Sequence, residues 1–290
     1  MLEDVRGPDD VTRRARLATR FAGLAPRRRL LIITVTLVVV VAAAASVAAT
    51  VAAGGSNPAG ASAARPGGPA QNRPGPVVLV PGYGGGTGSL DSLASRIRAT
   101  GRAATVLQLP GTGTGSLLTD AALLAEAVNR YLRQGAPSVD VIGYSAGGVV
   151  ALIWARHDDG AARARRVITL GSPFHGTRLA AAAAALVPGA CPPACQQLVP
   201  GSSLLGSLDV ADPAGLPHWM SLWTTDDQVV TPPDSALLPG AIDVQVQSVC
   251  PAARVSHSQL PTSPAVVAMV LQALGRSPMA RPTAADCVSS

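Results

Sequence analysis

The sequence predicts an α/β domain in which a mostly parallel sheet has helices on both faces. Short runs rich in Val, Ile and Leu alternate along the chain with longer segments whose apolar residues recur at helical spacing. Apolar runs without polar alternation are typical of strands buried on both faces, and such strands occur in parallel sheets between two helical layers. The 290 residues are enough for one such domain and one appended segment.

The predicted elements alternate along residues 76–290, which we expect to form the folded domain. Strands are predicted at 76–80, 103–109, 138–143, 166–170, 218–224 and 242–249, and helices at 90–100, 117–135, 146–156 and 264–274. An Ala-rich insert, too short for a separate domain, lies between the fourth and the fifth strand.

An uncharged apolar segment at 30–53 precedes the domain. It contains no helix breaker, and as a helix it measures about 36 Å, more than a bilayer core of about 30 Å. Eight arginines lie before it, and the next charge after it is Arg65. By the positive-inside rule, this asymmetry predicts a cytoplasmic segment at 1–29, a transmembrane anchor, and a domain outside the cell. The alternative is a signal peptide cleaved after the "VAA" that ends at Ala53, which would secrete the domain.

The composition around the domain predicts a linker and argues against nucleic acid as a partner. Residues 54–75 are rich in Gly, Pro and Ala and bury no core, so we expect a flexible linker there. The net charge of +6 is unevenly spread, since eight of the 23 arginines precede Leu30 against four acids. The remainder is nearly balanced and has no basic stripe with interleaved aromatic residues, so we expect no nucleic-acid binding.

The four cysteines are expected to form two disulfides outside the cytoplasm. They lack the paired C-x-x-C spacing of a zinc site, and the four histidines are scattered, so we expect neither a metal nor a cofactor. Three pairings are open. We favour Cys191 with Cys195 and Cys250 with Cys287, because neighbouring cysteines close a loop most easily.

A serine between two glycines, in "VIGYSAGG" at 141–148, is the strongest chemical signal in the sequence. A strand is predicted before Ser145 and a helix after it, and such a sharp turn lifts the hydroxyl clear of the sheet. Side chains at Gly143 and Gly147 would clash with neighbouring segments. The pattern therefore predicts that Ser145 is a nucleophile.

A serine nucleophile needs a base, and the order of the chain selects His257. Among the four histidines, only His257 follows both the last predicted strand and every acid at a strand end. The base needs a carboxylate in turn, which the end of the strand at 218–224 offers as Asp226 or Asp227. These two neighbours point to opposite faces of an extended segment, so only one of them can serve.

Two backbone N–H groups are expected to stabilise the oxyanion of a tetrahedral intermediate. The amide of Ala146 follows the serine directly. The second amide is expected in the glycine-rich loop "VPGYGGG" at 80–86, and its position selects Tyr83. The same loop lacks the Gly-Lys-Ser/Thr ending of a phosphate-binding loop.

With these motifs in order, the chain resembles the α/β-hydrolase superfamily, and within it the small bacterial secreted lipases and esterases. The resemblance rests on "VVLVPGYGG", "VIGYSAGG", "LGSPFHGT", "DDQVV" and "SHSQLPTSP" and covers roughly residues 77–275. It implies a triad of Ser145, Asp227 and His257, because the acid in this family precedes an apolar pair. Pro81 and Phe174 depart from the family, which often has histidine at both places.

The resemblance implies a serine hydrolase that cleaves carboxylic esters, with lipid esters as the expected substrates, through an acyl-enzyme intermediate. Together with the segment at 30–53, this predicts a membrane-tethered or secreted enzyme. Three alternatives stay open at this point. Thioester hydrolysis and acyl transfer to another acceptor would use the same triad. A non-catalytic envelope protein would keep the fold without needing these residues.

Overall fold

The computed structural model describes residues 68–158, 160–186, 189, 191–208, 210 and 216–287. The predicted cytoplasmic segment 1–29, the predicted membrane segment 30–53 and most of the predicted linker 54–75 lie outside these residues. No helix in the described ranges is long and apolar enough to span a membrane.

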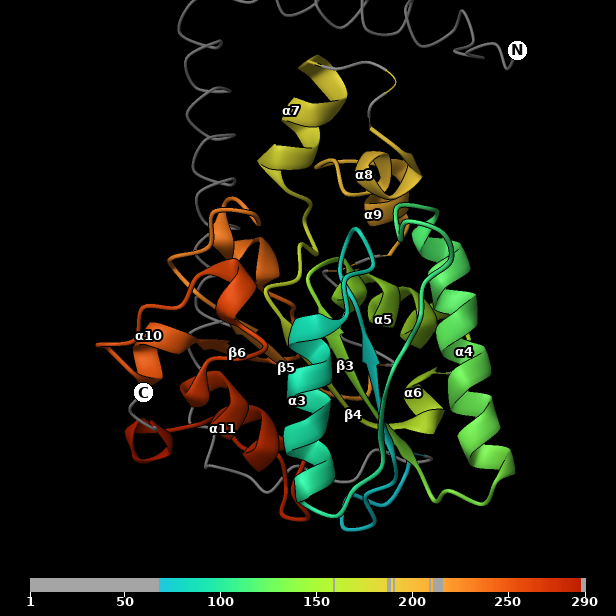
Figure 1. Ribbon diagram of the computed structural model, residues 1–290, viewed down its shortest axis with the longest axis vertical. Helices are drawn as coiled ribbons and strands as arrows, with labels where there is room; N and C mark the ends of the chain where they lie inside the picture. Colours follow the sequence, from blue (N-terminus) through green and yellow to red (C-terminus); the bar gives the residue numbers. More distant parts are fainter. Residues whose placement is uncertain are drawn as a thin grey trace, which may run out of the picture. The chain divides into compact units, whose positions relative to one another are not determined.

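Six parallel strands form the central sheet of the described chain, in the order β2-β1-β3-β4-β5-β6 (Figure 1). They are β1 (Val77–Val80), β2 (Ala104–Val106), β3 (Val139–Tyr144), β4 (Ala164–Leu170), β5 (His218–Trp223) and β6 (Ile242–Gln245). Every residue of β1 and of β4 is buried, which suits the apolar sequence of β1 and includes two arginines at the start of β4. The predicted parallel sheet is therefore confirmed.

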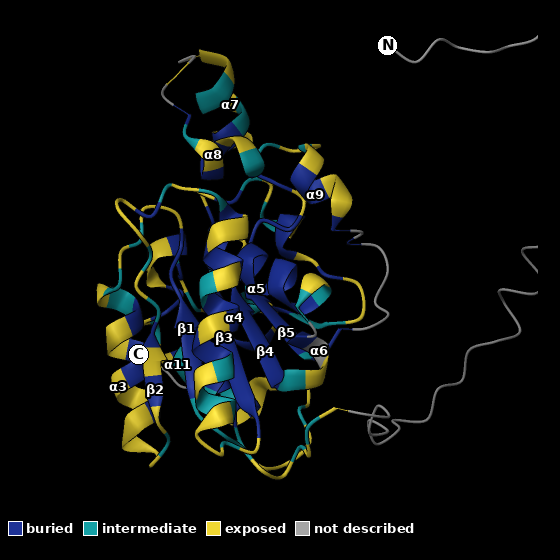
Figure 2. Ribbon diagram, turned by 90° about the vertical axis from the view of Figure 1, so that its right-hand side faces the viewer, coloured by how far each residue is buried: buried dark blue, intermediate teal, exposed yellow. Residues whose placement is uncertain are grey.

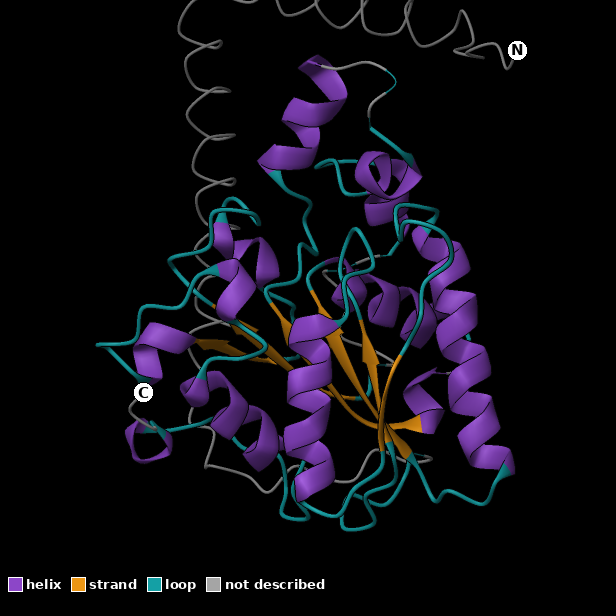
Figure 3. Cartoon of the chain, viewed as in Figure 1, coloured by secondary structure: helices purple, strands orange, loops and turns teal. Residues whose placement is uncertain are grey.

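Helices cover both faces of the sheet, as Figure 3 shows. On one face, α3 (Gly88–Ala99) and α11 (Pro264–Ala273) pack on side chains such as Leu79 and Ile168. On the other face, α4 (Leu117–Arg133) and α5 (Ala146–His157) pack on side chains such as Val141. The sheet thus separates two apolar cores, and in Figure 2 its strands are almost wholly buried.

Shorter helices complete the described chain. They are α6 (Gly160–Arg163), α7 (Arg178–Leu186), α8 (Pro193–Gln197), α9 (Ser203–Ser207), α10 (Val246–Val249) and the 3₁₀ turns η1 (Pro233–Ala236), η2 (His257–Gln259) and η3 (Ala284–Asp286). The helix α7 forms in the Ala-rich insert and projects beyond α8 and α9 (Figures 1 and 2). Its Leu179 and Leu186 are 54% and 79% exposed.

The strand predicted at 242–249 is shorter than expected, because Val246–Val249 form the helix α10. The alternation of apolar and polar residues continues past Gln245, the last residue of β6, through Val246 and Gln247. Val246 and Val249 are both buried, and they stand three residues apart, which places them on one side of a helical turn. This segment therefore fits both the two-residue repeat of a strand and the repeat of a helix, and the burial of Val246 and Val249 selects the helix.

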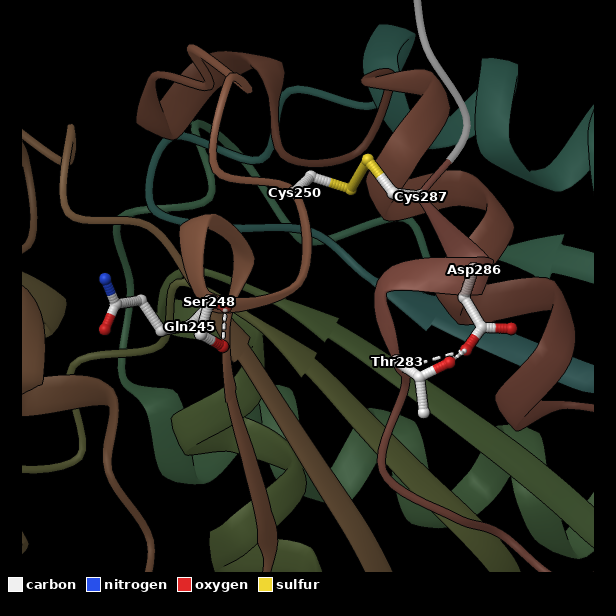
Figure 4. Close-up of a disulfide and its surroundings, with 6 residues drawn as sticks. All are labelled: Gln245, Ser248, Cys250, Thr283, Asp286 and Cys287. Atoms are coloured by element: carbon white, nitrogen blue, oxygen red, sulfur yellow. Dashed lines mark hydrogen bonds between the residues drawn. A yellow bond between two sulfur atoms is a disulfide. The ribbon is translucent and has the colours of Figure 1, made fainter.

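Both favoured cysteine pairs are joined in the structure. Cys191–Cys195 closes a small loop at α8. Cys250–Cys287 ties the residue after α10 to the C-terminal tail beside η3, where the Asp286 carboxylate accepts hydrogen bonds from Thr283 (Figure 4).

Three arginines surround one buried aspartate at the amino ends of the strands. The Asp140 carboxylate, fully buried in β3, accepts hydrogen bonds from Arg165 at 2.5 and 3.0 Å and from Arg102 at 2.8 Å. The neighbouring Arg166 is also fully buried. Burial, and then the charge of Arg165, lower the pKa of Arg166 to about 10. We call Arg102, Asp140, Arg165 and Arg166 the arginine cluster.

The arginine cluster holds the beginning of the described chain against the end of α11. Arg165 donates to the carbonyl oxygens of Gln71, Leu274 and Gly275, each at 2.8 Å. Arg102 donates to the carbonyl oxygens of Gly75 and Leu274. The last carbonyls of a helix lack intrahelical partners and carry partial negative charge, so the guanidinium groups satisfy and stabilise that end of α11.

Candidate active site

The strand order reverses at β1, which has β2 on one side and β3 on the other. In open parallel sheets, such a reversal leaves a crevice outside the carboxyl ends of the two diverging strands, and ligands bind there. The glycine-rich loop follows β1 and Ser145 follows β3. The topology therefore brings the two segments together at the place where a ligand is expected.

Ser145 occupies a strained backbone conformation between β3 and α5. Its φ of 54° and ψ of −125° make it the only non-glycine residue in the described part of the chain with a positive φ. Its N–H donates to the carbonyl of Leu170 at 2.8 Å, which fixes the turn against β4. Strain of this kind persists only where the surroundings impose it, and it clusters at functional sites.

The glycines around Ser145 leave no room for side chains. A Cβ on Gly143 would lie 2.5 Å from the Cα of Gly148, and one on Gly147 would collide with the carbonyl of Val80. A Cβ on Gly82 would lie 2.9 Å from the Cβ of Ser145. The strand, the helix and the glycine-rich loop thus meet at the serine in close backbone contact.

His257 and Asp227 form a buried pair. The His257 Nδ1 lies 2.7 Å from the Asp227 Oδ2, and both residues are 6% exposed. The other carboxylate oxygen of Asp227 accepts hydrogen bonds from the N–H groups of Val229 and Val230 at 2.9 and 2.8 Å. A carboxylate fixed in this way orients the imidazole and selects the tautomer with a proton on Nδ1.

Asp226 has different partners. Its carboxylate accepts a long hydrogen bond of 3.5 Å from the Gln247 side chain, and its N–H donates to the Thr224 hydroxyl. The Thr224 hydroxyl donates in turn to the carbonyl of Val255, two residues before His257. Of the two candidate acids, Asp227 is the one in contact with His257.

Gly171 lies directly behind this pair, a position that the sequence analysis did not single out. Its φ is +56°, and a Cβ there would lie 3.1 Å from the His257 Nδ1 and 3.2 Å from the Asp227 Oδ2. Because Gly171 follows Leu170, which binds the Ser145 N–H, one short segment contacts both the serine turn and the His–Asp pair. A glycine directly after a predicted strand was the available signal.

Tyr144 also contacts His257, a contact that no motif in the sequence predicts. The centroids of the two rings are 5.1 Å apart with an angle of 32° between the planes. The Tyr144 hydroxyl donates to the main-chain carbonyl of His257 at 3.3 Å. Burial, and then the charge of Asp227, raise the pKa of Tyr144 to about 12. An aromatic residue immediately before the serine was the only signal in the sequence.

Two backbone amides are available beside Ser145. The Ala146 N–H begins α5, and the Tyr83 N–H follows Gly82, which touches the serine. Neither amide donates a hydrogen bond within the described ranges. The loop is braced by hydrogen bonds from Gly84 to Gly113 and from Gly85 to Gly82, each 3.0 Å long. Tyr83 is 47% exposed, and its neighbour Gly82 is the residue of this loop that approaches Ser145.

Two other histidines lie in different surroundings from His257. His175 Nδ1 lies 3.2 Å from the carbonyl of Ser235, and His157 is exposed at the end of α5. The described residues contain no group of three side chains suited to a metal ion. Phe174, one of the two departures from the family, is fully buried edge-to-face against Trp219 and fills the core.

Comparisons with known proteins agree with this fold. The thioesterase domain family matches residues 75–173, less than half of the chain. The structure is similar to Aspergillus fumigatus lipase B, with a TM-score of 0.60 and 21% identity, over 73% of this chain and 55% of that one. It is also similar to the mature form of Bacillus licheniformis lipase BlEst2, with a TM-score of 0.58 and 18% identity, over 74% of this chain and 96% of that one. No curated protein gives a significant match.

The topology and these likenesses show that the chain has the α/β-hydrolase fold, as the order of its motifs predicted. The two solved structures that it is similar to are both lipases. The chain spans little more than half the length of the Aspergillus lipase.

Proposed function

We propose that this protein is a serine hydrolase that cleaves carboxylic esters through an acyl-enzyme intermediate. The observation that carries the proposal is that adjacent residues hold two features: Leu170 accepts from the N–H of the strained Ser145, and Gly171 lies against the buried His257–Asp227 pair. A strained serine, a histidine and an orienting carboxylate form the constellation that activates a hydroxyl. The lipase likeness in fold and the thioesterase-domain match support acyl chemistry.

In the proposed mechanism, the Ser145 hydroxyl attacks the carbonyl carbon of the ester while the His257 Nε2 takes its proton. The charge of Asp227 stabilises the imidazolium that forms. The tetrahedral intermediate collapses as the alcohol leaves with the proton from His257, and the acyl group stays on Ser145. A water molecule, deprotonated by His257, then attacks the acyl-enzyme to form a second tetrahedral intermediate. Its collapse releases the acid, and Ser145 takes back the proton from His257.

The oxyanion of both tetrahedral intermediates is proposed to accept hydrogen bonds from the N–H groups of Tyr83 and Ala146. Two features support this assignment, namely the close approach of Gly82 to Ser145 and the lack of any other acceptor for these amides among the described residues. Losing one such donor typically lowers kcat by about 10² to 10³.

The proposal is tested with p-nitrophenyl esters of graded chain length. We expect hydrolysis by the wild type and at least a 10³-fold loss in kcat for Ser145→Ala, which removes the nucleophile. Ser92→Ala, at an exposed position on α3, is the matched control and should keep full activity. Labelling of Ser145 by a serine-directed phosphonate, located by mass spectrometry, gives an independent readout. Full activity of a folded Ser145→Ala protein would refute the mechanism.

Thioester hydrolysis is the second candidate, favoured by the match to the thioesterase domain family. The same nucleophile, base and oxyanion donors serve both reactions, so the leaving group decides between them. An oxygen ester and a thioester with the same acyl chain separate the candidates. A higher kcat/KM for the oxygen ester supports the first proposal, and the opposite ranking supports the second. Added alcohols that divert product from acid to ester would instead indicate acyl transfer.

We propose further that the enzyme acts outside the cytoplasm, held at the membrane by residues 30–53. The support is the uncharged length of this segment and the arginines on one side of it. We expect the full-length chain to remain in the membrane pellet after a carbonate wash. A soluble protein whose N-terminal sequence begins near Gly54 would establish cleavage of a signal peptide instead.

A further inference from the structure

We propose that Tyr144 is the positioning residue for His257, holding the imidazole at a fixed place relative to the neighbouring Ser145. The inference rests on the proposed function, because it takes His257 to be the base. It assigns to the residue before the serine a role that neither the sequence pattern nor the comparisons give it.

Tyr144 restrains His257 at two points that the Asp227 contact does not reach. The hydrogen bond from the Tyr144 hydroxyl to the His257 carbonyl, 3.3 Å long, fixes the main chain of η2. The Tyr144 ring lies against the imidazole at 5.1 Å between centroids, which limits rotation of that ring. The Asp227 carboxylate holds Nδ1 at 2.7 Å. Three parts of His257, namely its main chain, its ring face and its Nδ1, are thus each held by a different contact.

The position of Tyr144 in the chain makes this restraint specific to the serine. Tyr144 is the last residue of β3, and Ser145 follows it in a backbone conformation that the Leu170 carbonyl fixes. The tyrosine side chain has only two torsions before its rigid ring. The nucleophile and the base are therefore linked through one short, stiff connection, although they lie 112 positions apart in the chain (257 minus 145). Such supporting contacts decide whether reacting groups meet in a productive geometry.

The Tyr144 hydroxyl also keeps its proton wherever the triad operates. The phenol is half-buried, and the Asp227 carboxylate disfavours a second negative charge nearby, so the pKa is raised to about 12. The hydroxyl therefore stays a donor to the His257 carbonyl across the working pH range.

Three variants separate positioning from general stabilisation. Tyr144→Phe removes only the hydroxyl, and Tyr144→Leu removes the ring as well. Tyr131→Phe is the matched control, because the half-buried Tyr131 near the end of α4 bonds through its hydroxyl to the Thr105 hydroxyl of β2 at 2.6 Å and makes no contact with His257 among the described interactions. The readouts are kcat and KM on a p-nitrophenyl ester, and the far-downfield proton signal of the His257 Nδ1–H in NMR spectra.

We expect Tyr144→Phe to lower kcat about tenfold and Tyr144→Leu about 10²-fold, with KM nearly unchanged, because a displaced base slows the chemical step and not substrate binding. The Nδ1–H signal should broaden or vanish in Tyr144→Leu, since solvent reaches an imidazole that has lost its cover. Tyr131→Phe should change neither readout.

Wild-type kcat and an intact Nδ1–H signal in Tyr144→Leu would overturn the inference. If Tyr144→Leu does not fold, the test depends on Tyr144→Phe, and an unchanged kcat in that variant overturns the inference. Failure of the proposed function looks different, because Ser145→Ala would then remain active while the NMR signal still reports whether Tyr144 holds His257.

Discussion

Asp226 and Asp227 are adjacent in the chain, yet only Asp227 contacts His257, while Asp226 binds the Gln247 side chain at the long distance of 3.5 Å. Asparagine at position 227 keeps the shape but loses the charge and favours the wrong imidazole tautomer, which in a serine triad lowers kcat roughly 10⁴-fold. We therefore expect Asp227→Asn to lose several orders of magnitude in kcat. Asp226→Asn, the matched control, should lose less than about tenfold, because its carboxylate orients no catalytic group. The opposite ranking, measured on one ester, would transfer the orienting role to Asp226.

Gly171 offers a second test at the scale of single residues. Gly171→Ala forces an alanine to a φ of +56° and places its Cβ 2.6 Å from Leu260 Cδ1 and 3.1 Å from the His257 Nδ1. We expect a fall of about tenfold or more in kcat together with a lower Tm, because the His–Asp pair must shift. Gly101→Ala, at a φ of +85° with nothing within 4 Å, carries the same type of backbone strain without the contact. Gly101→Ala should lower Tm but not kcat. Equal losses of kcat in Gly101→Ala and Gly171→Ala would show that the contact of Gly171 with the His–Asp pair does not matter.

Single residues were predictable from the sequence where chemistry restricts the choice. Ser145 stands in a motif, and His257 is selected by the order of the chain. Tyr144 and Gly171 were not predicted, because a tyrosine and a glycine are common residues whose role lies only in what they touch. Asp227 needed the family resemblance, since the pattern alone does not distinguish two adjacent carboxylates.

At the scale of elements, α4 buries an acidic residue on its apolar side. Asp120 is 3% exposed, and burial raises the pKa of its carboxyl. A folded-state pKa above the unfolded value means that the folded protein binds more protons in that range, so stability falls as pH rises through it. We expect Asp120→Asn to raise the free energy of unfolding at pH 7, measured by urea denaturation, with a gain that shrinks as the pH falls through the raised pKa of Asp120 and is lost below about 4.

Asp91 is the matched control for this prediction. It lies exposed in the first turn of α3, where a negative charge interacts favourably with the helix N-terminus. Asp91→Asn should therefore lower stability slightly at pH 7, by about 0.3–1 kcal/mol. If Asp120→Asn and Asp91→Asn change the free energy of unfolding in the same direction, the effect at Asp120 does not come from burial.

The helices and strands were predictable from the sequence where the apolar residues follow a single repeat. The helix α4 and the strands β1, β3 and β4 match their predicted ranges closely, because their apolar residues fit a single repeat. At 242–249 both repeats fitted, and only the packing of Val246 and Val249 distinguished them. For the Ala-rich insert, the sequence predicted only that it is too short for a separate domain. Its helix bounds were not predictable, since alanine fits a helix whether or not a partner covers it.

At the scale of the whole molecule, the arginine cluster makes the residues before β1 part of the fold. Gln71 accepts from Arg165 and Arg166, and the Gly75 carbonyl accepts from Arg102. A chain starting at residue 76 lacks these acceptors and leaves buried guanidinium groups short of partners, which costs about 1–3 kcal/mol for each unsatisfied group.

We therefore expect a protein starting at residue 76 to unfold at lower urea concentration than one starting at residue 68, by at least about 2 kcal/mol in free energy of unfolding. Phosphonate labelling of Ser145 should persist in both folded proteins, since the cluster lies at the opposite end of the strands. Identical unfolding curves would show that residues 68–75 add nothing to the domain. The compositional boundary at Pro76 does not reveal these contacts, because they depend on arginines distant in sequence.

Parallel pairing in the sheet has a consequence for how the chain gains activity. Each strand pairs with a neighbour reached only through a crossover, and Val77 of β1 lies opposite Asp140 of β3. The loop after β1 reaches Ser145 only when these strands have joined, and Asp227 comes into place only with β5. Contacts between residues so distant in the chain form late, because the entropy of long loops is lost before the contacts are made. A molecule arrested with its helices formed and its sheet unfinished would lack the assembled candidate site.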